Sequence, residues 1–531
     1  MTLMMLAATA AQSTVFVVNS TADTGPGSLR QAMLDANAQI VTGGSACAPH
    51  EIHFNIPGAG PHTIRPLSAL PPVLITITFD GYSQAGATPN SIPQGNNAAL
   101  KIELDGSQAG VADGLRFSAV MPGMPGCRGN LSVVTGLVIN RFQGAAIRVE
   151  SPCLPPAVCQ VGGIRIIGNF IGTDVTGSLP LGNGFGTIPQ PGVVFGANST
   201  RNIVGDEIVE SGGGSTLTPS NRNVISANAL DGIYLGSSPG RESALDHRIR
   251  NNAIGLSASG TTALPNGRHG VFADLGSEAT QIQDNLISGN SGDGVRMLAN
   301  SLFANIVRNG IGIGENGIAL GNAGAGVHVG GTASAVTISR RYALSPFVTA
   351  SIANNGGAGI FVDDAAMVDT AAASVSQNAG LELDVAPAGV NPNDPLDADA
   401  GPNERLNYPV ITSAVLNTAT STGTITGTFN STPGVHTDLV FFFSDHCDPS
   451  GYGGAQTAFN DGVPVAVIPD AQGNVSFVRN APSLPLNKFI TAQARRPSAN
   501  SATPGVVVVS EYSACRVVLA SSELIFEDGF E

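Results

Sequence analysis

The stretch Asn223–Leu235 reads NVISANALDGIYL, and the stretch Asn285–Met297 reads NLISGNSGDGVRM. The two stretches keep Asn, Ile, Asn, Asp and Gly at the same offsets and exchange residues between them. Constant positions separated by variable ones are typical of a structural repeat, whereas the residues of an active site usually occur only once in a chain. The pair therefore predicts architecture before it predicts chemistry.

Each repeat ends in a short strand that follows a turn. In DGIYL the Asp-Gly pair favours a turn, and strand alternation then places Ile233 and Leu235 on one side and Tyr234 on the other. Similar phrases recur at 144–149, 192–195, 270–273, 294–297, 326–329, 359–362 and 380–383. Two further phrases alternate with this one, the first starting at Gly168, Asn223, Asn251, Asp284 and Arg308, the second lying at 180–183, 264–266 and 320–322.

A unit of one strand and one turn is too small to bury an apolar face alone, so neighbouring units must stack. Stacking predicts an all-β solenoid whose inward Ile, Val and Leu side chains form columns along the core. Asn and Gly accept positive φ angles at the turns at low cost, and stacked Asn side chains can form hydrogen-bonded ladders.

One segment near the start has helical periodicity. In TGPGSLRQAMLDANAQ, Ser28 is a good N-cap and Gln31 completes a capping box. The apolar face of this helix consists of Leu29, Ala32, Met33 and Ala36. The open end of a solenoid exposes strand edges, so the helix over 28–38 is expected to cap that end.

Changes in composition and in the spacing of apolar residues divide the chain into six parts. They are a signal-like segment at 1–13, the cap and first coils at 14–125, the solenoid at 126–385, an Asp- and Pro-rich linker at 386–404, a β-sandwich at 405–520 and an acidic tail at 521–531. The strand lengths, alternation and turn spacing of the sandwich region favour an immunoglobulin-like arrangement.

Composition restricts the partners. The formal net charge of -15 and the pI near 4.9 disfavour nucleic acid and anionic membranes, which repel such a surface. No run approaches the roughly 20 apolar residues that span a bilayer, so no transmembrane segment is expected.

Six cysteines occur without a CxxC motif or a His at zinc-ligand spacing, which favours disulfides over a metal site. Sequence proximity and domain membership predict the pairs Cys153–Cys159, Cys47–Cys127 and Cys447–Cys515. Disulfides and the small residues of the signal-like segment favour a secreted or cell-surface protein.

The segment VNSTADTGPGSLRQAMLDAN resembles the N-terminal segment of secreted bacterial β-helix proteins of the CSLREA type. The motif core corresponds here to Gly27, Ser28, Leu29, Arg30, Gln31 and Ala32. The resemblance continues through NFIGTDVTGSLPLGN, RNVISAN and GVNPNDPLDADAGPN and covers nearly the whole chain. It implies a right-handed parallel β-helix with a terminal β-sandwich in an exported, surface-associated protein, and it implies no particular reaction.

The chain contains parts of two catalytic patterns of polysaccharide-cleaving β-helices. The order expected of a polygalacturonase-like hydrolase is not matched, because the pair Asp363 and Asp364 follows HRIR and RHG instead of preceding them. A lyase-like site can be drawn from Asp231, Asp284 and Asp293 with Arg222, Arg248 and Arg250. Asp231 and Asp293, however, share the repeat position before Gly, where Asp favours turn geometry alone. No catalytic residue is therefore assigned.

The outward position of the Gly-led strands carries large or cationic side chains. In chain order it holds Arg148, Val194, Tyr234, Phe272, Arg296, His328, Phe361 and Glu382. If the strands stack, the central five, Tyr234, Phe272, Arg296, His328 and Phe361, form a strip suited to stacking on sugar rings and holding acidic groups. The alternative is that the aromatic residues only stabilise neighbouring strands.

The linker offers a dense set of oxygen ligands, namely Asp394, Asp397, Asp399 and Glu404. Their offsets do not match an EF-hand, but the set predicts a calcium site, with a solvated linker as the alternative.

Together these observations predict an exported, surface-associated β-helix protein for adhesion or binding of a polysaccharide or cell-surface glycan. Two alternatives stay open: a polysaccharide lyase or glycoside hydrolase acting on an acidic glycan, and a structural spacer.

Overall fold

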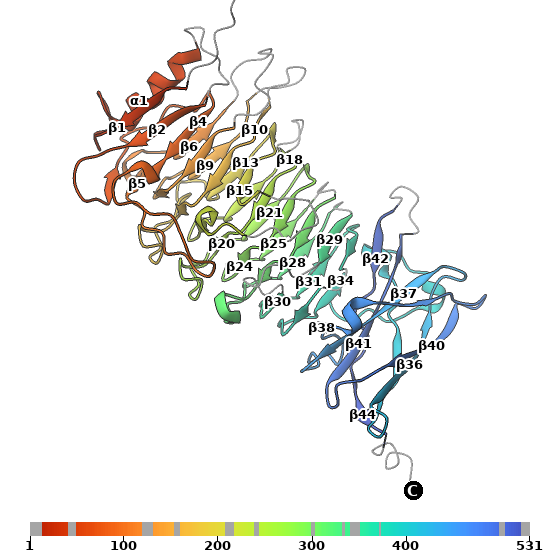
Figure 1. Ribbon diagram of the computed structural model, residues 1–531. Coiled ribbons are helices and arrows are strands. Elements are labelled where there is room, and N and C mark those ends of the chain that lie inside the picture. Colours follow the sequence, from red (N-terminus) through yellow and green to blue (C-terminus); the bar gives the residue numbers. More distant parts are fainter. Residues whose placement is uncertain are drawn as a thin grey trace, which may run out of the picture.

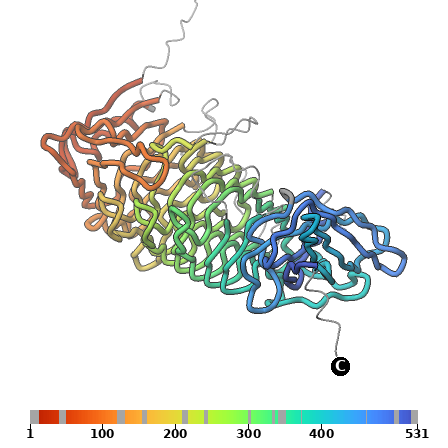
Figure 2. Tube along the Cα trace, turned by 60° about the horizontal axis from the view of Figure 1, so that its bottom comes forward, coloured from red at the N-terminus to blue at the C-terminus, as the bar shows by residue number. Residues whose placement is uncertain are grey.

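The computed structural model describes residues 13–40, 49–118, 131–152, 160–207, 217–237, 244–298, 303–331, 335–339, 351–370, 373–498 and 505–521. The predicted fold class is confirmed: a right-handed parallel β-helix is followed by a C-terminal β-sandwich of mostly antiparallel strands (Figure 1). The tube in Figure 2 shows the coils stacked in chain order, with the sandwich at the end of the stack.

Three long parallel sheets and one short sheet build the β-helix. Sheet A contains β1 (Val15–Val18), β2 (His50–Phe54), β4 (Ile77–Asp80), β7 (Val133–Thr135), β11 (Arg165–Ile167), β15 (Ile203–Gly205), β19 (Arg248–Arg250), β23 (Gln281–Gln283), β26 (Asn305–Val307), β29 (Val336–Ser339) and β32 (Val368–Asp369). Sheet B contains β3 (His62–Ile64), β5 (Ile102–Asp105), β8 (Leu137–Asn140), β12 (Phe170–Ile171), β16 (Val224–Ile225), β20 (Ala253–Ile254), β24 (Leu286–Ile287), β27 (Gly310–Ile311), β30 (Ser351–Ala353) and β33 (Val375–Ser376).

Sheet C contains β6 (Leu115–Phe117), β9 (Ile147–Val149), β13 (Val193–Phe195), β17 (Ile233–Leu235), β21 (Val271–Ala273), β25 (Val295–Met297), β28 (Val327–Val329), β31 (Ile360–Val362) and β34 (Leu383–Val385). Sheet D contains β10 (Val161–Gly162), β14 (Ser199–Thr200), β18 (Ala244–Leu245) and β22 (Ser277–Glu278). In each full coil a strand of sheet A is followed by one of sheet B and one of sheet C. The repeated sequence phrases are therefore successive strands of one coil with the turns beside them: NVISAN contains β16 of sheet B, and DGIYL contains β17 of sheet C.

The repeated Asn residues form the predicted ladders. The second Asn of NVISAN, Asn228, donates from Nδ2 to Oδ1 of Asn266 at 3.0 Å, and Asn266 donates to Asn290 at 2.9 Å. This ladder consists of Asn183, Asn228, Asn266, Asn290, Asn322, Asn355 and Asn378. The first Asn of the phrase belongs to a second ladder, formed by Asn169, Asn223, Asn252, Asn285 and Asn309.

Helix α1 (Leu29–Asn37) packs against β1 and β2 at the N-terminal end of the β-helix (Figure 1). Its buried residues are Leu29, Ala32, Met33 and Ala36, as the periodicity predicts. Ser28 Oγ accepts a hydrogen bond from the backbone N–H of Gln31 at 3.2 Å. The other half of the capping box is wrong, because the Gln31 side chain donates to Asp35 Oδ1 instead.

The sandwich contains two sheets. The first consists of β35 (Val410–Asn417), β36 (Thr422–Asn430), β40 (Asn474–Ala481) and β44 (Leu519–Ala520). The second consists of β37 (Thr437–Ser444), β38 (Thr457–Ala458), β39 (Val465–Val467), β41 (Phe489–Pro497), β42 (Val507–Val509) and β43 (Arg516–Val517). Short 3-10 turns are η1 (Ala38–Ile40), η2 (Gly81–Ser83), η3 (Gly106–Gln108), η4 (Pro219–Asn221), η5 (Glu315–Gly317), η6 (Pro395–Asp397), η7 (Pro402–Arg405) and η8 (Phe459–Gly462).

Strand β37 connects the two units because both of its faces are buried. Leu439 and Phe441 belong to the sandwich core, whereas Val440 and Phe442 belong to the core of the β-helix. A strand covered on both faces reads as a continuous apolar run, which explains the sequence DLVFFFSD. The sandwich therefore closes the C-terminal end of the β-helix, opposite α1.

The disulfide Cys447–Cys515 is confirmed and joins segments 68 residues apart beside this junction. The other predicted pairs, Cys153–Cys159 and Cys47–Cys127, lie outside the described residues.

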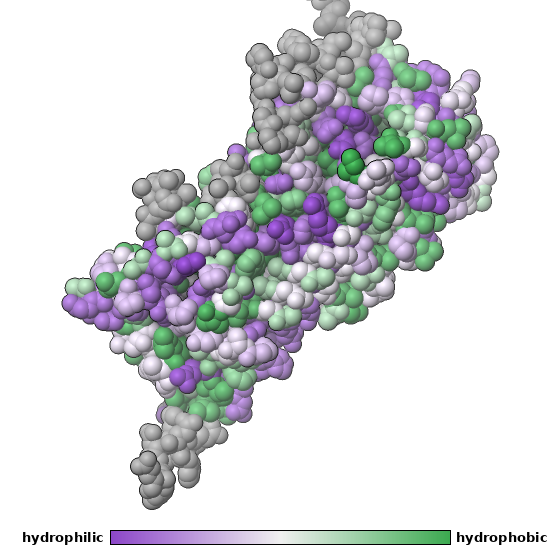
Figure 3. Space-filling view, turned by 180° about the vertical axis from the view of Figure 1, so that it is seen from behind, coloured by the Kyte–Doolittle hydropathy of each residue, from purple (hydrophilic) through white to green (hydrophobic). Residues whose placement is uncertain are grey.

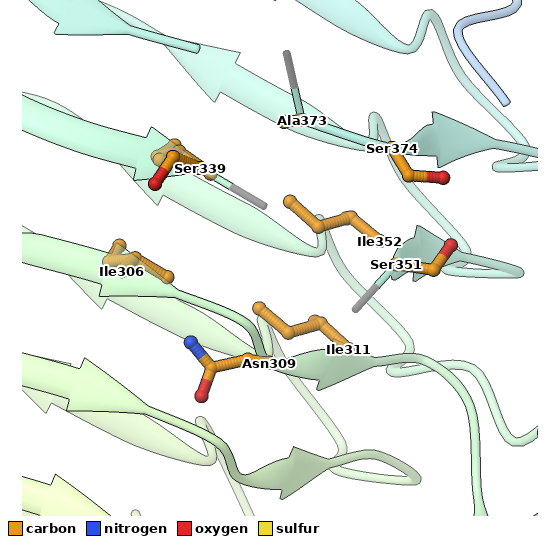
Figure 4. Close-up of a pocket in the computed structure, with 9 residues that line it drawn as sticks. Ile306, Asn309, Ile311, Ser339, Ser351, Ile352, Ala373 and Ser374 are labelled. Carbon is orange, nitrogen blue, oxygen red and sulfur yellow. The ribbon is translucent and has the colours of Figure 1, made fainter. Parts of the chain in front are cut away.

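Figure 4 shows an interior cavity between sheets A and B near the C-terminal coils. Its volume is about 20 Å³, and its lining is Ile306, Asn309, Ile311, Ile338, Ser339, Ser351, Ile352, Ala373 and Ser374. A space of this size holds about one water molecule. It is therefore too small for an organic ligand.

Candidate functional site

Parallel register aligns one outward side chain from every strand of sheet C. Tyr234 pairs with Phe272, Phe272 with Arg296, Arg296 with His328, and His328 with Phe361. The five predicted strip residues therefore lie on five consecutive strands of sheet C. These strands are the rungs of the β-helix and lie about 4.8 Å apart. The complete outer column reads Arg116, Arg148, Val194, Tyr234, Phe272, Arg296, His328, Phe361 and Asp384.

The end of this column differs from the prediction. Asp384, not Glu382, pairs with Phe361, because the strand begins at Leu383, later than the repeat phrase indicates. Glu382 is 3% exposed and accepts a hydrogen bond from Asn378 Nδ2 at 2.6 Å. It therefore ends the ladder that runs from Asn183 to Asn378 instead of facing outward.

Sheets B and C differ in what covers their outer faces. The outer side chains of Val138, Phe170 and Val224 on sheet B pack against Leu100 and Tyr82 of the long segment 81–101. The outer residues at the centre of sheet C are less covered: Tyr234, Arg296 and Phe361 are half-buried. Phe272 and His328 are 7% and 8% exposed, so the strip is less open than the sequence suggests.

Two rungs form an aromatic group. The rings of Tyr234 and Phe272 meet edge to face with centroids 5.5 Å apart. The guanidinium of Arg268, from the turn before β21, lies over the Phe272 ring at 4.6 Å. Asp231 holds Arg268 through two hydrogen bonds, from Nε at 2.9 Å and from Nη2 at 2.5 Å. The cation is thereby fixed on the aromatic face.

The next rungs form a charged group around His328. Its Nε2 lies 2.9 Å from Asp363 Oδ2, and its Nδ1 lies 3.5 Å from Asp293 Oδ2. Arg296 Nη1 donates to the same Asp293 oxygen at 3.3 Å. The ring of His328 also packs edge to face on Phe361, with centroids 5.0 Å apart.

The two histidines at this face differ in protonation. Burial lowers the pKa of His328, but the hydrogen bonds to Asp293 and Asp363 outweigh burial and raise it above the ordinary value. Burial lowers the pKa of His269 to about 4, although Asp293 opposes this shift. The Asp293 backbone N–H donates to His269 Nδ1 at 2.9 Å, which fits a neutral ring. Of these two histidines, His328 is therefore the one whose charged form the surroundings favour.

The outer arginine on an earlier strand of the column, Arg148, is also held by hydrogen bonds. Arg148 Nε donates to Asp113 at 2.9 Å and its Nη2 donates to Gln190 at 2.7 Å. Gln190 belongs to a turn that carries the exposed side chains of Phe185 and Ile188, 69% and 73% accessible. Apolar surface thus borders the column on this side.

The sequence did not single out Arg268, His269 and Asp363 as site residues, and it assigned Asp231 and Asp293 to turns. The available signal was their offset: Asp231 and Asp293 come three residues before an outer strand residue, and Asp363 comes two residues after one. A carboxylate at the edge of a rung reaches the outer residue of a neighbouring coil, which only the stacking register reveals.

Among the described residues, the structure forms one ion pair of the lyase-like set drawn from the sequence, Asp284 with Arg250. Asp284 accepts hydrogen bonds from Arg250 at the end of β19 and from Arg308, the residue after β26, at 2.8 Å each. Arg222 pairs instead with Glu315 at 2.7 Å, and both of these side chains are buried. These groups stabilise corners of the coils.

Carboxylate oxygens of Asp394, Asp397 and Asp399 lie within 4.8 Å of one another in the linker. Burial and the neighbouring Asp394 raise the pKa of Asp399. Glu404 lies outside this group, and Arg496 contacts both, with Nη1 at 3.0 Å from Glu404 Oε2 and Nη2 at 3.1 Å from Asp397 Oδ2. The predicted set of four ligands is thus reduced to three.

No family model matches the chain, and no curated protein matches it. Among solved structures, the A-module of Azotobacter vinelandii mannuronan C-5 epimerase AlgE6 is 13% identical, with 71% of this chain and 91% of that chain covered and a TM-score of 0.39. The periplasmic alginate epimerase AlgG is 11% identical, with 61% and 70% covered and a TM-score of 0.33. Pectate lyase Pel9A is 13% identical, with 70% of each chain covered and a TM-score of 0.26.

Among the described residues, no helix is long and apolar enough to cross a membrane.

Proposed function

We propose that this protein binds a polysaccharide along the outer face of sheet C. The observation that carries the proposal is the register: Tyr234, Phe272, Arg296, His328 and Phe361 occupy five consecutive rungs of one column. Aromatic faces stack on the apolar faces of sugar rings, and oriented Arg–Asp pairs offer donors and acceptors to hydroxyl groups. A repeating ligand laid along the β-helix axis meets a repeating surface, so weak contacts accumulate.

The test removes the two accessible aromatic rings, with Tyr234→Ala and Phe361→Ala combined. Each stacking contact contributes about 1 kcal/mol, so the double variant should bind a retained polysaccharide roughly 30-fold more weakly. Phe303→Ala is the matched control, since Phe303 is 64% exposed but outside the strands of sheet C. Affinity electrophoresis against a panel of plant, algal and bacterial polysaccharides measures the effect. Equal loss in the control, or no loss in the double variant, contradicts the proposal.

A second candidate function is catalysis at the same face. It is favoured by His328, which lies between Asp293 and Asp363 and beside Arg296, because a histidine held by carboxylates is a suitable proton donor. His328→Gln and Asp363→Asn should then abolish release of unsaturated or reducing sugar ends. A parent protein that releases neither product on the whole panel leaves binding as the function.

We also propose export to the cell surface, with adhesion as the role of glycan binding. The Cys447–Cys515 disulfide supports an oxidising compartment, and the resemblance to CSLREA-type proteins points the same way. A structural spacer is the remaining alternative. It predicts that cells lacking the protein adhere normally once a spacer of equal length replaces it.

For the linker, we propose that Asp394, Asp397 and Asp399 hold a calcium ion. Three carboxylates in mutual reach suit a hard cation, and Asp394 Oδ1 is buried without a hydrogen-bond partner among the described residues. Calcium should slow proteolysis within 386–404, and Asp394→Asn should remove that protection. Equal cleavage in calcium and in chelator contradicts the site.

A further inference from the structure

The cations along the sheet C face are already neutralised by carboxylates. Asp231 holds Arg268, Asp293 holds Arg296, and Asp113 holds Arg148. Upstream, Arg116 Nη2 donates to Glu150 Oε1 at 3.1 Å. An anion arriving at this face therefore competes with an existing carboxylate for each guanidinium group, and displacing that carboxylate leaves it with its charge unpaired.

Carboxylates outnumber guanidinium groups around the five central rungs. Asp231, Asp274, Asp293 and Asp363 face Arg268 and Arg296 there. Burial is the main cause that raises the pKa of the Tyr234 phenol, and the charges of Asp274 and Asp231 raise it further, against the opposing effect of Arg268. His328 adds at most one positive charge. The formal net charge of the whole chain, -15, acts in the same direction at longer range.

These pairs nevertheless leave polar atoms for a neutral partner. Arg296 uses only Nη1 in its contact with Asp293, and its side chain is 31% exposed. The Tyr234 hydroxyl makes no hydrogen bond to the described residues and lies near the backbone of Gly236. Sugar hydroxyls donate and accept, so they can bind fixed charge pairs without separating them, beside the rings of Tyr234 and Phe361.

We infer that the ligand of this face is a neutral polysaccharide segment, and that the charged residues of the strip recognise hydroxyl groups rather than carboxylate or sulfate groups. The inference rests on the proposed function and narrows it. It departs from the sequence-based expectation of an acidic glycan, because pairing and the excess of carboxylates become visible only when neighbouring coils are stacked.

The experiment uses matched polymers that differ only in charge: polygalacturonate, alginate and hyaluronan, each beside its carboxyl-reduced form, together with neutral glucans, mannans, xylans and galactans. The parent protein is tested by affinity electrophoresis at low and high NaCl. A neutral polymer should be retained, at least about tenfold more tightly than its acidic counterpart where a pair exists, a difference of about 1.4 kcal/mol. Retention should change less than about twofold with salt, because no net charge is neutralised.

Two variants separate the explanations. Asp274→Asn removes one carboxylate beside Tyr234 and should increase retention of the acidic polymers while leaving the neutral ones within about twofold. Arg296→Gln keeps a donor and should weaken neutral retention only modestly. Tighter, salt-sensitive binding of an acidic polymer that Arg296→Gln abolishes overturns this inference but leaves glycan binding intact. Retention of no polymer, or retention unaffected by the Tyr234→Ala and Phe361→Ala changes, overturns the proposed function itself.

Discussion

Asn290 shows at the scale of one residue how the repeat specifies the fold. Its Nδ2 donates to Asn322 Oδ1 at 2.8 Å, and its Oδ1 accepts from Asn266 Nδ2 at 2.9 Å. Its backbone N–H donates to Asn322 Oδ1 as well, so one side chain serves two neighbouring coils. Buried amides without partners are costly, and Asn is the residue type that both donates and accepts in this geometry.

Asn290→Ala should destabilise the protein by about 2–3 kcal/mol, because one N–H of buried Asn266 loses its acceptor and Asn322 Oδ1 loses one of its two donors from Asn290. The control is Asn305→Ala, at an outer position of sheet A where the side chain is half-buried. Chemical denaturation monitored by circular dichroism measures both variants. Equal losses in the two variants contradict a special role for the ladder.

Glu382 makes stability depend on pH. Burial, with a smaller effect from Asp448, raises its pKa to about 7 from the ordinary 4.5. A carboxyl group whose pKa is raised on folding stabilises the protein fully below the unfolded pKa, and this stability is lost as pH rises through about 7. Glu382→Gln should therefore stabilise the protein at pH 8 by on the order of 2–3 kcal/mol and change little at pH 4.

Denaturation midpoints of the parent and Glu382→Gln proteins across that pH range provide the measurement. Glu278→Gln, on sheet D, serves as the control and should follow the parent profile. A constant difference between Glu382→Gln and the parent at every pH would refute a titration at this position.

At the scale of the element, α1 has the sequence of an amphipathic helix but acts as an end cap. Met33 is 2% exposed and Ala36 is fully buried, within the same core cluster as Val18 and Ile52 of the first strands. In a stacked array each coil contacts only its neighbours, so a defect at the end spreads inward from that end. The helix therefore matters most for the coils next to it.

Met33→Ala should cost about 2–4 kcal/mol in that region by leaving a cavity under the helix. Hydrogen exchange should rise in β1 and β2 and stay unchanged in β28 and β31. Leu34→Ala is the control, since Leu34 is 47% exposed on the same helix. Uniform acceleration along the whole β-helix contradicts the role of a local cap.

At the scale of the whole molecule, the sandwich packs directly against the β-helix. Arg495 and Asp369 form two hydrogen bonds across the junction, at 3.0 and 2.8 Å, and Glu511 accepts from the backbone N–H of Val385. Figure 3, which views the molecule from behind, shows hydrophilic and hydrophobic residues intermixed on the surface of both units. The sandwich thus closes one end of the β-helix, as α1 closes the other.

Replacing Cys447 and Cys515 by Ser should lower stability by about 4 kcal/mol, because the disulfide closes a loop with a sequence separation of 68. The loss should begin in the sandwich, since both cysteines flank its strands. Hydrogen exchange should therefore rise first in β37 and β43, with β17 and β21 protected. Simultaneous loss of protection in all four strands would instead show that the two units unfold as one.

The sequence predicted what depends on local periodicity. The offsets of Asn223, Asn228 and Gly232 predict a coil corner, an amide ladder and a strand start, and the alternation in IYL places Tyr234 outward. These features repeat at fixed spacing, so each copy supports the next. The helical pattern at 29–36 and the pairing of Cys447 with Cys515 followed from equally local or domain-level information.

Only the tertiary structure decided what depends on the length of each coil. The turns between strands differ in length, so the sequence does not show that Asp293 lies beside His328, or that Asp384 rather than Glu382 ends the outer column. Nor does it show that Arg268 is held by Asp231 over Phe272. Neighbouring residues of the ladder that contains Asn228 are 23 to 45 positions apart in the sequence, and only the stacking of coils brings them into contact.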